Sequence, residues 1–161
     1  MRTKIWIFVF LLAAARSTPA AAQSVKHIQT KEAGIASAVW VGEMLYVSGQ
    51  LPSPVTPADR AKGTLAVYGN TQTQAENVFG KIQNLLKEQG LGLGDVVMMR
   101  VYMAVDPASN KLDFAGMNAA YNKFFGTTDQ PNKPARSTVQ VAALVAAGAS
   151  LEVEVQATRS K

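Results

Sequence analysis

The spacing of apolar and polar residues along this chain predicts five strands and two helices. β-rich runs within 36–50 lie on either side of Gly42-Glu43, which is typical of a hairpin. The segment 95–105, rich in valine, methionine and tyrosine, predicts a third strand. The last two strands are expected over 137–145 and 151–158.

Two details of this pattern concern what covers the strands. Met44 to Ser48 is almost wholly apolar, which indicates a strand covered on both faces. Arg100 interrupts the third strand and is expected to face solvent or an interface. The segment 51–70 carries several helix-breaking residues and predicts a long surface loop. These residues are Pro52, Pro54, Pro57 and Gly63.

Two segments have helical spacing instead. The segment 71–89 predicts a helix with one apolar stripe that should pack on the core. At its start Thr71 and Gln74 fit a capping box, and after its end Gly90 fits a left-handed terminator. The stripe comprises Ala75, Val78, Phe79, Ile82, Leu85 and Leu86. The second helix is expected over 110–125, with an aromatic stripe that should also be core. That stripe comprises Phe114, Met117, Tyr121, Phe124 and Phe125. The order ββ, α, β, α, ββ predicts an α+β fold with helices packed on a mixed sheet.

The first residues of the chain resemble a secretory signal peptide rather than part of the fold. Arg2 and Lys4 precede an apolar run over 5–15, and Ala20-Ala21-Ala22 forms a small-residue cleavage site. We therefore expect a cleaved signal peptide at 1–22, a single domain at 23–161, and a periplasmic or secreted protein. The alternative is a retained anchor, but the run is shorter than the roughly 20 residues that span a bilayer.

Charge and composition limit the kinds of binding site that this chain can form. Without Arg2, Lys4 and Arg16, thirteen basic and eleven acidic residues remain, so the formal net charge falls from +5 to +2. That charge gives little support to nucleic-acid binding. The chain has no cysteine, which excludes disulfides and thiolate sites, and its single histidine, His27, cannot form a histidine metal cluster. We expect no metal and no organic cofactor, and place His27 in a loop.

An arginine and two glutamates stand out in the last two strands. Arg136, at the start of one strand, offers a planar fork suited to a carboxylate. Glu152 and Glu154 alternate with apolar residues, so one face of their strand should be apolar and the other acidic. A glutamate near such an arginine can activate a water. The alternatives are an interface salt bridge for Arg136, with Glu152 as one candidate partner, and a solvated face for the glutamates.

Seven short motifs, in order along nearly all of 23–161, make the chain resemble the RidA/YjgF reactive-intermediate deaminases. The motifs are Tyr46-Val47-Ser48-Gly49-Gln50, Gly94-Asp95-Val96-Val97, Val101-Tyr102, Asp113-Phe114 with Met117-Asn118, Tyr121 with Phe124-Phe125, Pro134-Ala135-Arg136-Ser137-Thr138-Val139, and Leu151-Glu152-Val153-Glu154. The resemblance implies a chorismate-mutase-like fold with two helices on one face of the sheet. It also implies a homotrimer with ligand sites between neighbouring subunits.

The resemblance further implies hydrolysis of enamine and imine acids such as 2-aminoacrylate, or 2-iminopropanoate, to 2-oxo acids and ammonia, without a cofactor. Arg136 then holds the substrate carboxylate and Glu152 directs the water. The residues implied to line the pocket are Ser48 and Gly49 at its floor, Asn118 nearby and Thr138 through its main chain.

One position departs from the family pattern. Many active members carry a pocket tyrosine where this chain has Ile35. This departure and the export signal favour a second hypothesis, an exported small-carboxylate-binding protein on the same trimeric scaffold with little turnover. A third, an RNA-directed activity, is disfavoured by the low charge of 23–161. None of these hypotheses includes stable membrane insertion after signal cleavage.

Overall fold

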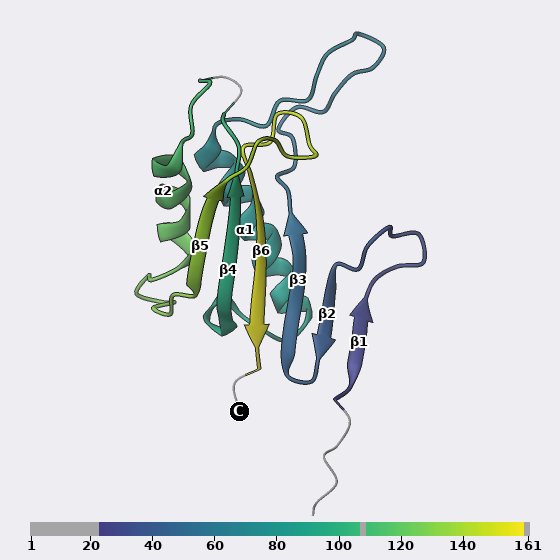
Figure 1. The fold of residues 1–161 in the computed structure, drawn as a ribbon, viewed down its shortest axis with the longest axis vertical. Helices are drawn as coiled ribbons and strands as arrows, with labels where there is room; N and C mark the ends of the chain where they lie inside the picture. Colours follow the sequence, from purple (N-terminus) through teal and green to yellow (C-terminus); the bar gives the residue numbers. More distant parts are fainter. Residues whose placement is uncertain (1–22, 107–108, 160–161) are drawn as a thin grey trace, which may run out of the picture.

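A six-stranded mixed sheet with two helices on one face makes up the computed structural model, which describes residues 23–106 and 109–159 (Figure 1). The strands are β1 (Val25–Ile28), β2 (Ala38–Val41), β3 (Met44–Gln50), β4 (Val96–Met103), β5 (Ala135–Gln140) and β6 (Leu151–Thr158). The helices are α1 (Thr71–Glu88), α2 (Phe114–Phe124) and a 3₁₀ turn η1 (Leu93–Asp95). The predicted α+β class, with both helices on one face, is confirmed.

The strand order is β1-β2-β3-β6-β4-β5, so the last strand of the chain lies in the middle of the sheet. β6 pairs antiparallel with both β3 and β4, and β4 pairs parallel with β5. The β2–β3 hairpin turns at Gly42, whose φ of 59° suits glycine. The outer strands β1 and β5 are the two edges.

Several sequence predictions need correction at their boundaries. β1 was not predicted, and His27, expected in a loop, lies in it. The strand expected over 137–145 is β5, which begins earlier and ends at Gln140. It ends there because its partner β4 ends at Met103, opposite Gln140, and leaves 141–145 without a neighbouring strand.

Capping residues set where the helices begin. Asn70, not Thr71, caps α1, because its Oδ1 accepts from Thr73 N at 2.9 Å. α2 begins at Phe114 rather than at Asn110, whose φ of 53° is left-handed and incompatible with a helix. Asp113 caps α2 by accepting from Gly116 N at 2.8 Å.

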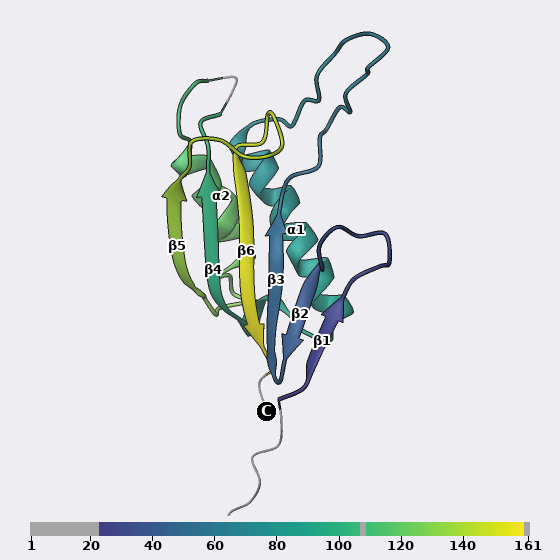
Figure 2. The ribbon, with the colours of Figure 1, turned by 45° about the vertical axis from the view of Figure 1, so that its right-hand side comes forward.

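The core lies between the helices and one face of the sheet (Figure 2). The stripe predicted for α1 is confirmed, with only Leu85 partly rather than fully buried. Most of the α2 stripe is also in the core, but Phe114 is 46% exposed, so its prediction was wrong. Phe114 is the first residue of the helix, where the chain enters from the surface loop.

Both helices of the described residues lie on the same side, so none of those residues places a helix over the other face of the sheet (Figures 1 and 2). Along β6 every second side chain, beginning with Glu152, lies on this open face, and the intervening apolar residues are buried against the helices. The predicted division of β6 into an apolar and an acidic face is therefore confirmed. Tyr46 of β3 is 43% exposed here, so Met44–Ser48 is not covered on both faces within one chain.

Two segments outside the sheet complete the description. The loop 51–70 was predicted correctly and folds back on itself through isolated bridges, Thr56 to Val67 and Asp59 to Thr64. The expected signal peptide, 1–22, lies outside the described residues. Within the described part of the chain, no helix combines the length and apolar character needed to cross a membrane.

Candidate functional site

Arg136 lies on β5 and points toward α2, on the helix-covered side of the sheet. Its Nη2 donates to Asn118 Oδ1 at 2.8 Å, and its Nη1 donates to Met117 Sδ at 3.9 Å. The guanidinium carbon lies 4.4 Å from the centroid of the Tyr121 ring. Among the described residues no carboxylate forms an ion pair with Arg136. The guanidinium is therefore held by neutral groups, and no charge of the described residues compensates its own.

Asn118 and Thr138 lie on the same side of β5 as Arg136. Asn118 contacts the guanidinium directly, whereas Thr138 follows Arg136 by two residues and so points to the same face. The Thr138 hydroxyl is buried and has no hydrogen-bond partner among the described residues. Because β5 is an edge strand, its outer main-chain groups face no neighbouring strand, which suits the expected main-chain contacts to a ligand.

Glu152, Ser48 and Gly49 form a second group, on the open face. Val47 pairs with Val155 and Gln50 with Val153, so Ser48 and Gly49 together oppose Glu154 in a β-bulge. The Glu152 carboxylate lies directly over Gly49, where an added Cβ would collide with it. Ser48 Oγ donates to the Ala36 carbonyl at 2.7 Å, which ties the loop before β2 to the bulge. Ile35 lies in that loop and is 73% exposed.

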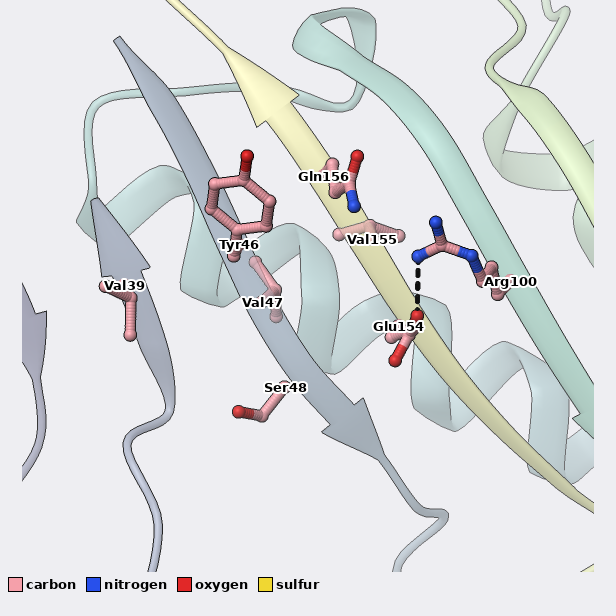
Figure 3. Close-up of a pocket in the computed structure, with 8 residues that line it drawn as sticks. All are labelled: Val39, Tyr46, Val47, Ser48, Arg100, Glu154, Val155 and Gln156. Carbon is pink, nitrogen blue, oxygen red and sulfur yellow. Dashed lines mark hydrogen bonds and ion pairs between the residues drawn. The ribbon is translucent and has the colours of Figure 1, made fainter. Parts of the chain in front are cut away.

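A hollow of about 230 Å³ adjoins this second group (Figure 3). Its lining comes from four strands, β2, β3, β4 and β6. The lining residues are Val39, Tyr46, Val47, Ser48, Arg100, Glu154, Val155 and Gln156. Arg100 Nη1 and Glu154 Oε1 lie 2.7 Å apart across β4 and β6. Arg100 thus faces the open side as expected, and Glu154 is paired rather than simply solvated.

The carboxylates of the open face affect a neighbouring tyrosine. Tyr102 of β4 is paired in register with Glu152 and lies beside Glu154. Burial raises the pKa of Tyr102, and the negative charge of Glu154 raises it further. The phenol, protonated at neutral pH as in any ordinary tyrosine, can donate to a carboxylate, and the shift strengthens that preference.

The sequence-predicted residues consequently fall into two groups that one chain does not bring together. Arg136 pairs in register with Met99, which is buried beneath the helices, whereas Glu152 pairs with Tyr102 on the open face. Glu152 lies on β6 and Arg136 lies on β5, with β4 between the two strands. Their side chains lie on opposite faces of the sheet. Arg136 is accordingly not paired with Glu152 within the chain, and a site using both needs a second copy.

Sequence reasoning missed one neighbour of Arg136. Tyr121 was assigned only to the core, yet its ring also supports the guanidinium. A signal for this was present, because Tyr121 follows Met117 by four residues and Asn118 by three, which brings its side chain close to both on the helix surface. Elsewhere in the described residues, no three His, Cys, Asp or Glu side chains gather in a group that could hold a metal ion.

The sequence of this chain matches a known protein family and several known proteins. Residues 28–159 match the family model described as endoribonuclease L-PSP. Protein HMF1 of Saccharomyces cerevisiae is 35% identical over 138 residues, which cover 86% of each chain.

Two solved structures are also similar. Escherichia coli TdcF with bound serine has a TM-score of 0.63 and 29% identity, over 84% of this chain and 99% of that one. NMB1025 of Neisseria meningitidis, a member of the YjgF protein family, has a TM-score of 0.65 over 87% of this chain and 98% of that one. Its 19% identity supports the likeness of fold alone.

Proposed function

Because this chain belongs to the endoribonuclease L-PSP family, which includes the YjgF and RidA proteins, we propose that it is a hydrolase of 2-enamino and 2-imino acids. The substrates are of the 2-aminoacrylate type, and the products are 2-oxo acids and ammonia. The observation that carries the proposal is the uncompensated guanidinium of Arg136. A rigid, unpaired guanidinium fork is suited to binding a carboxylate. The serine bound in the TdcF structure is a small carboxylate of the same kind.

The reaction needs little from the protein. An enamine becomes an electrophilic imine without catalysis, by taking up a proton at carbon and losing one from nitrogen. Water then adds to the imine carbon, forming a carbon–oxygen bond and a carbinolamine. The carbon–nitrogen bond then breaks as the hydroxyl loses its proton and the nitrogen gains one, which releases ammonia and leaves the 2-oxo acid. In this scheme Arg136 holds the carboxylate, and Glu152 accepts a proton from the water and returns it to the leaving amine.

Within one chain, Arg136 and Glu152 lie on opposite faces of the sheet, and this determines the assembly we propose. Arg136 of one subunit and Glu152 of its neighbour form one site in the cleft of a homotrimer. A cyclic trimer presents the same two different surfaces at each interface. The uncovered face of the sheet, with Tyr46 exposed and the Arg100–Glu154 ion pair, supplies a surface with both apolar and polar groups for this contact.

The activity is tested on purified residues 23–161 with 2-aminoacrylate generated freshly in the assay. We expect release of ammonia and pyruvate above the spontaneous rate, and loss of that excess in Arg136→Ala. Arg60→Ala is the matched control, because Arg60 is an exposed arginine of the loop 51–70 and is not among the residues that line the hollow or hold Arg136. If the parent and Arg136→Ala release pyruvate equally, the proposal is wrong. RNA cleavage that survives Arg136→Ala would support a ribonuclease instead.

Subunit mixing tests whether the site is shared. Arg136→Ala and Glu152→Ala should each be inactive alone. After unfolding and refolding together in equal amounts, they should recover about one quarter of the parent rate, because most trimers are then mixed and each mixed trimer has one intact site. No recovery, in a mixture that light scattering shows to be trimeric, would place both residues in one subunit's site and contradict the geometry.

A small-carboxylate binder with little turnover is the second candidate. It is favoured by Ile35, which replaces a family tyrosine at an exposed position in the loop tied to Ser48. Under this alternative the parent binds pyruvate through Arg136 but releases no excess ammonia. An Ile35→Tyr variant that gains turnover would assign the difference to this position.

Export is a separate proposal. It rests on the pattern of 1–22, with a short positive start, an apolar run and an alanine site. Expression of the full chain in a bacterial host should yield a periplasmic product whose N-terminus is Gln23. A product that keeps residues 1–22 and sediments with membranes would indicate an anchor.

A further inference from the structure

The cradle around Arg136 comes from one face of α2. Met117, Asn118 and Tyr121 contact the guanidinium, and these residues lie within four positions of one another on the helix. The guanidinium carbon is 4.4 Å from the Tyr121 ring centroid, well inside the roughly 6 Å range of a cation–π contact. The ring face and the Asn118 hydrogen bond therefore both restrict where the guanidinium can lie.

Tyr121 is itself rigid. Its side chain is 8% exposed, and its ring stacks on Phe125 with centroids 5.0 Å apart and an interplanar angle of 15°. Phe79 of α1 meets it edge-on at 6.2 Å. A ring held by two core aromatics cannot follow a mobile side chain, so it restricts the arginine rather than adapting to it.

The ring face, rather than the hydroxyl, is the part that acts on Arg136. The Tyr121 phenol is neutral at pH 7 because the ordinary tyrosine pKa is about 10, and burial raises the pKa further, so the phenol does not cancel the arginine charge. A neutral aromatic face orients a guanidinium without occupying its N–H groups. The contacts to Asn118 and Met117 use only part of the guanidinium's donors. The remaining donors stay available to a ligand.

We propose that Tyr121 is a positioning residue, which holds the Arg136 fork in the plane and rotation that a substrate carboxylate requires. The inference rests on the proposed function, in which Arg136 is the carboxylate anchor. Restricting the arginine before the ligand arrives lowers the entropy lost on binding, which is the general basis of preorganisation. The contribution is to binding of the carboxylate and not to the chemical step, because the carboxylate is held alike in substrate and transition state.

The test compares Tyr121→Leu with Tyr121→Phe in residues 23–161. The probes are pyruvate and its uncharged amide, with dissociation constants from calorimetry, together with KM and kcat for 2-aminoacrylate. Tyr121→Leu should weaken pyruvate binding and raise KM by about tenfold, while kcat stays within about threefold. Tyr121→Phe keeps the ring face and should match the parent within about twofold. Binding of the amide should be the same in all variants.

Phe124→Leu is the matched control for core loosening. Phe124 belongs to the same helix and packs on Phe79 at 5.5 Å, but it is not among the residues that hold Arg136 through a hydrogen bond or a cation–π contact. We expect it to lower the melting temperature and leave pyruvate affinity unchanged. If Phe124→Leu weakens pyruvate binding as much as Tyr121→Leu, or if Tyr121→Phe fails as badly as Tyr121→Leu, the positioning role is refuted.

Failure of this inference is distinguishable from failure of the proposed function. Pyruvate binding that survives Arg136→Ala, or no binding by the parent, overturns the anchor role and with it the role of Tyr121. Pyruvate binding that needs Arg136 but is unchanged in Tyr121→Leu overturns only the positioning role.

Discussion

Replacing Gly49 by alanine displaces the side chain of Glu152, the proposed water-directing group, without changing its charge. Gly49 lies in the β-bulge beneath Glu152, and an added Cβ would collide with the Glu152 carboxylate oxygen. It would also come within 2.8 Å of Cδ and 3.1 Å of Cγ of the same side chain. The whole end of Glu152 must therefore move, whereas the main chain of the bulge need not, since no backbone atom is among the close neighbours.

The size of the effect follows from that displacement. A shift on the order of 1 Å in a group that places a reactant costs roughly 10²-fold in rate. This corresponds to about 2.7 kcal/mol in the activation free energy. Because the obstructing atoms belong to the end of a flexible side chain, the free energy of unfolding should change by less than about 1 kcal/mol.

The assay measures kcat for 2-aminoacrylate hydrolysis and the unfolding free energy of the same samples. Gly80→Ala is the control, because an added Cβ there meets no atom within 4 Å and alanine favours the α1 helix. It should keep the parent rate and gain about 0.5–1 kcal/mol of stability. In a Glu152→Ala background, any residual rate above the spontaneous one should be the same with and without Gly49→Ala. An undiminished loss in that background, or a Gly49→Ala rate within twofold of the parent, would refute the reasoning.

Three further predictions concern stability, each measured by denaturant unfolding. Asn70→Ala removes the α1 cap and should cost about 1 kcal/mol, whereas Asn70→Asp should cost little; equal losses would exclude capping as the cause. Phe79→Ala opens a cavity in the aromatic core and should cost about 3–5 kcal/mol; a loss under 1 kcal/mol would mean that the core closes around it. The hydrogen bond from Lys123 lowers the pKa of Glu76, so this pair stabilises the folded state above the ordinary glutamate pKa and is lost as pH falls through the lowered value. Glu76→Gln should therefore cost about 0.2–1 kcal/mol at pH 7, and the cost should shrink as the pH falls from the ordinary glutamate pKa through the lowered one; a deficit independent of pH would contradict the assignment.

Most of the fold could be predicted from local pattern. The α1 stripe, the hairpin turn at Gly42 and the alternation of β6 each depend on residues close in sequence, and all were confirmed. Errors occurred where a distant partner decides the outcome. β1 is mostly exposed and is a strand because it pairs with β2, and β5 stops at Gln140 because β4 ends opposite it.

Some features of the candidate site could likewise be predicted from local pattern, and others could not. The acidic face of Glu152 was predictable because its neighbours Leu151 and Val153 are apolar and must be buried. The direction of Arg136 was not predictable, because polar and small residues occupy both faces of the edge strand β5 and leave no apolar pattern to orient it. The support from Tyr121 was likewise hidden within a stripe that reads as core.

The sequence by itself thus determined the family, the order of elements and the residue types available for carboxylate chemistry, because these depend on local periodicity and short motifs. Only the tertiary structure decided that Arg136 and Glu152 lie on opposite faces of one sheet. The reason is that strand register, the bulge at Ser48-Gly49 and the packing of α2 against β5 set side-chain direction, and each involves residues far apart in the chain.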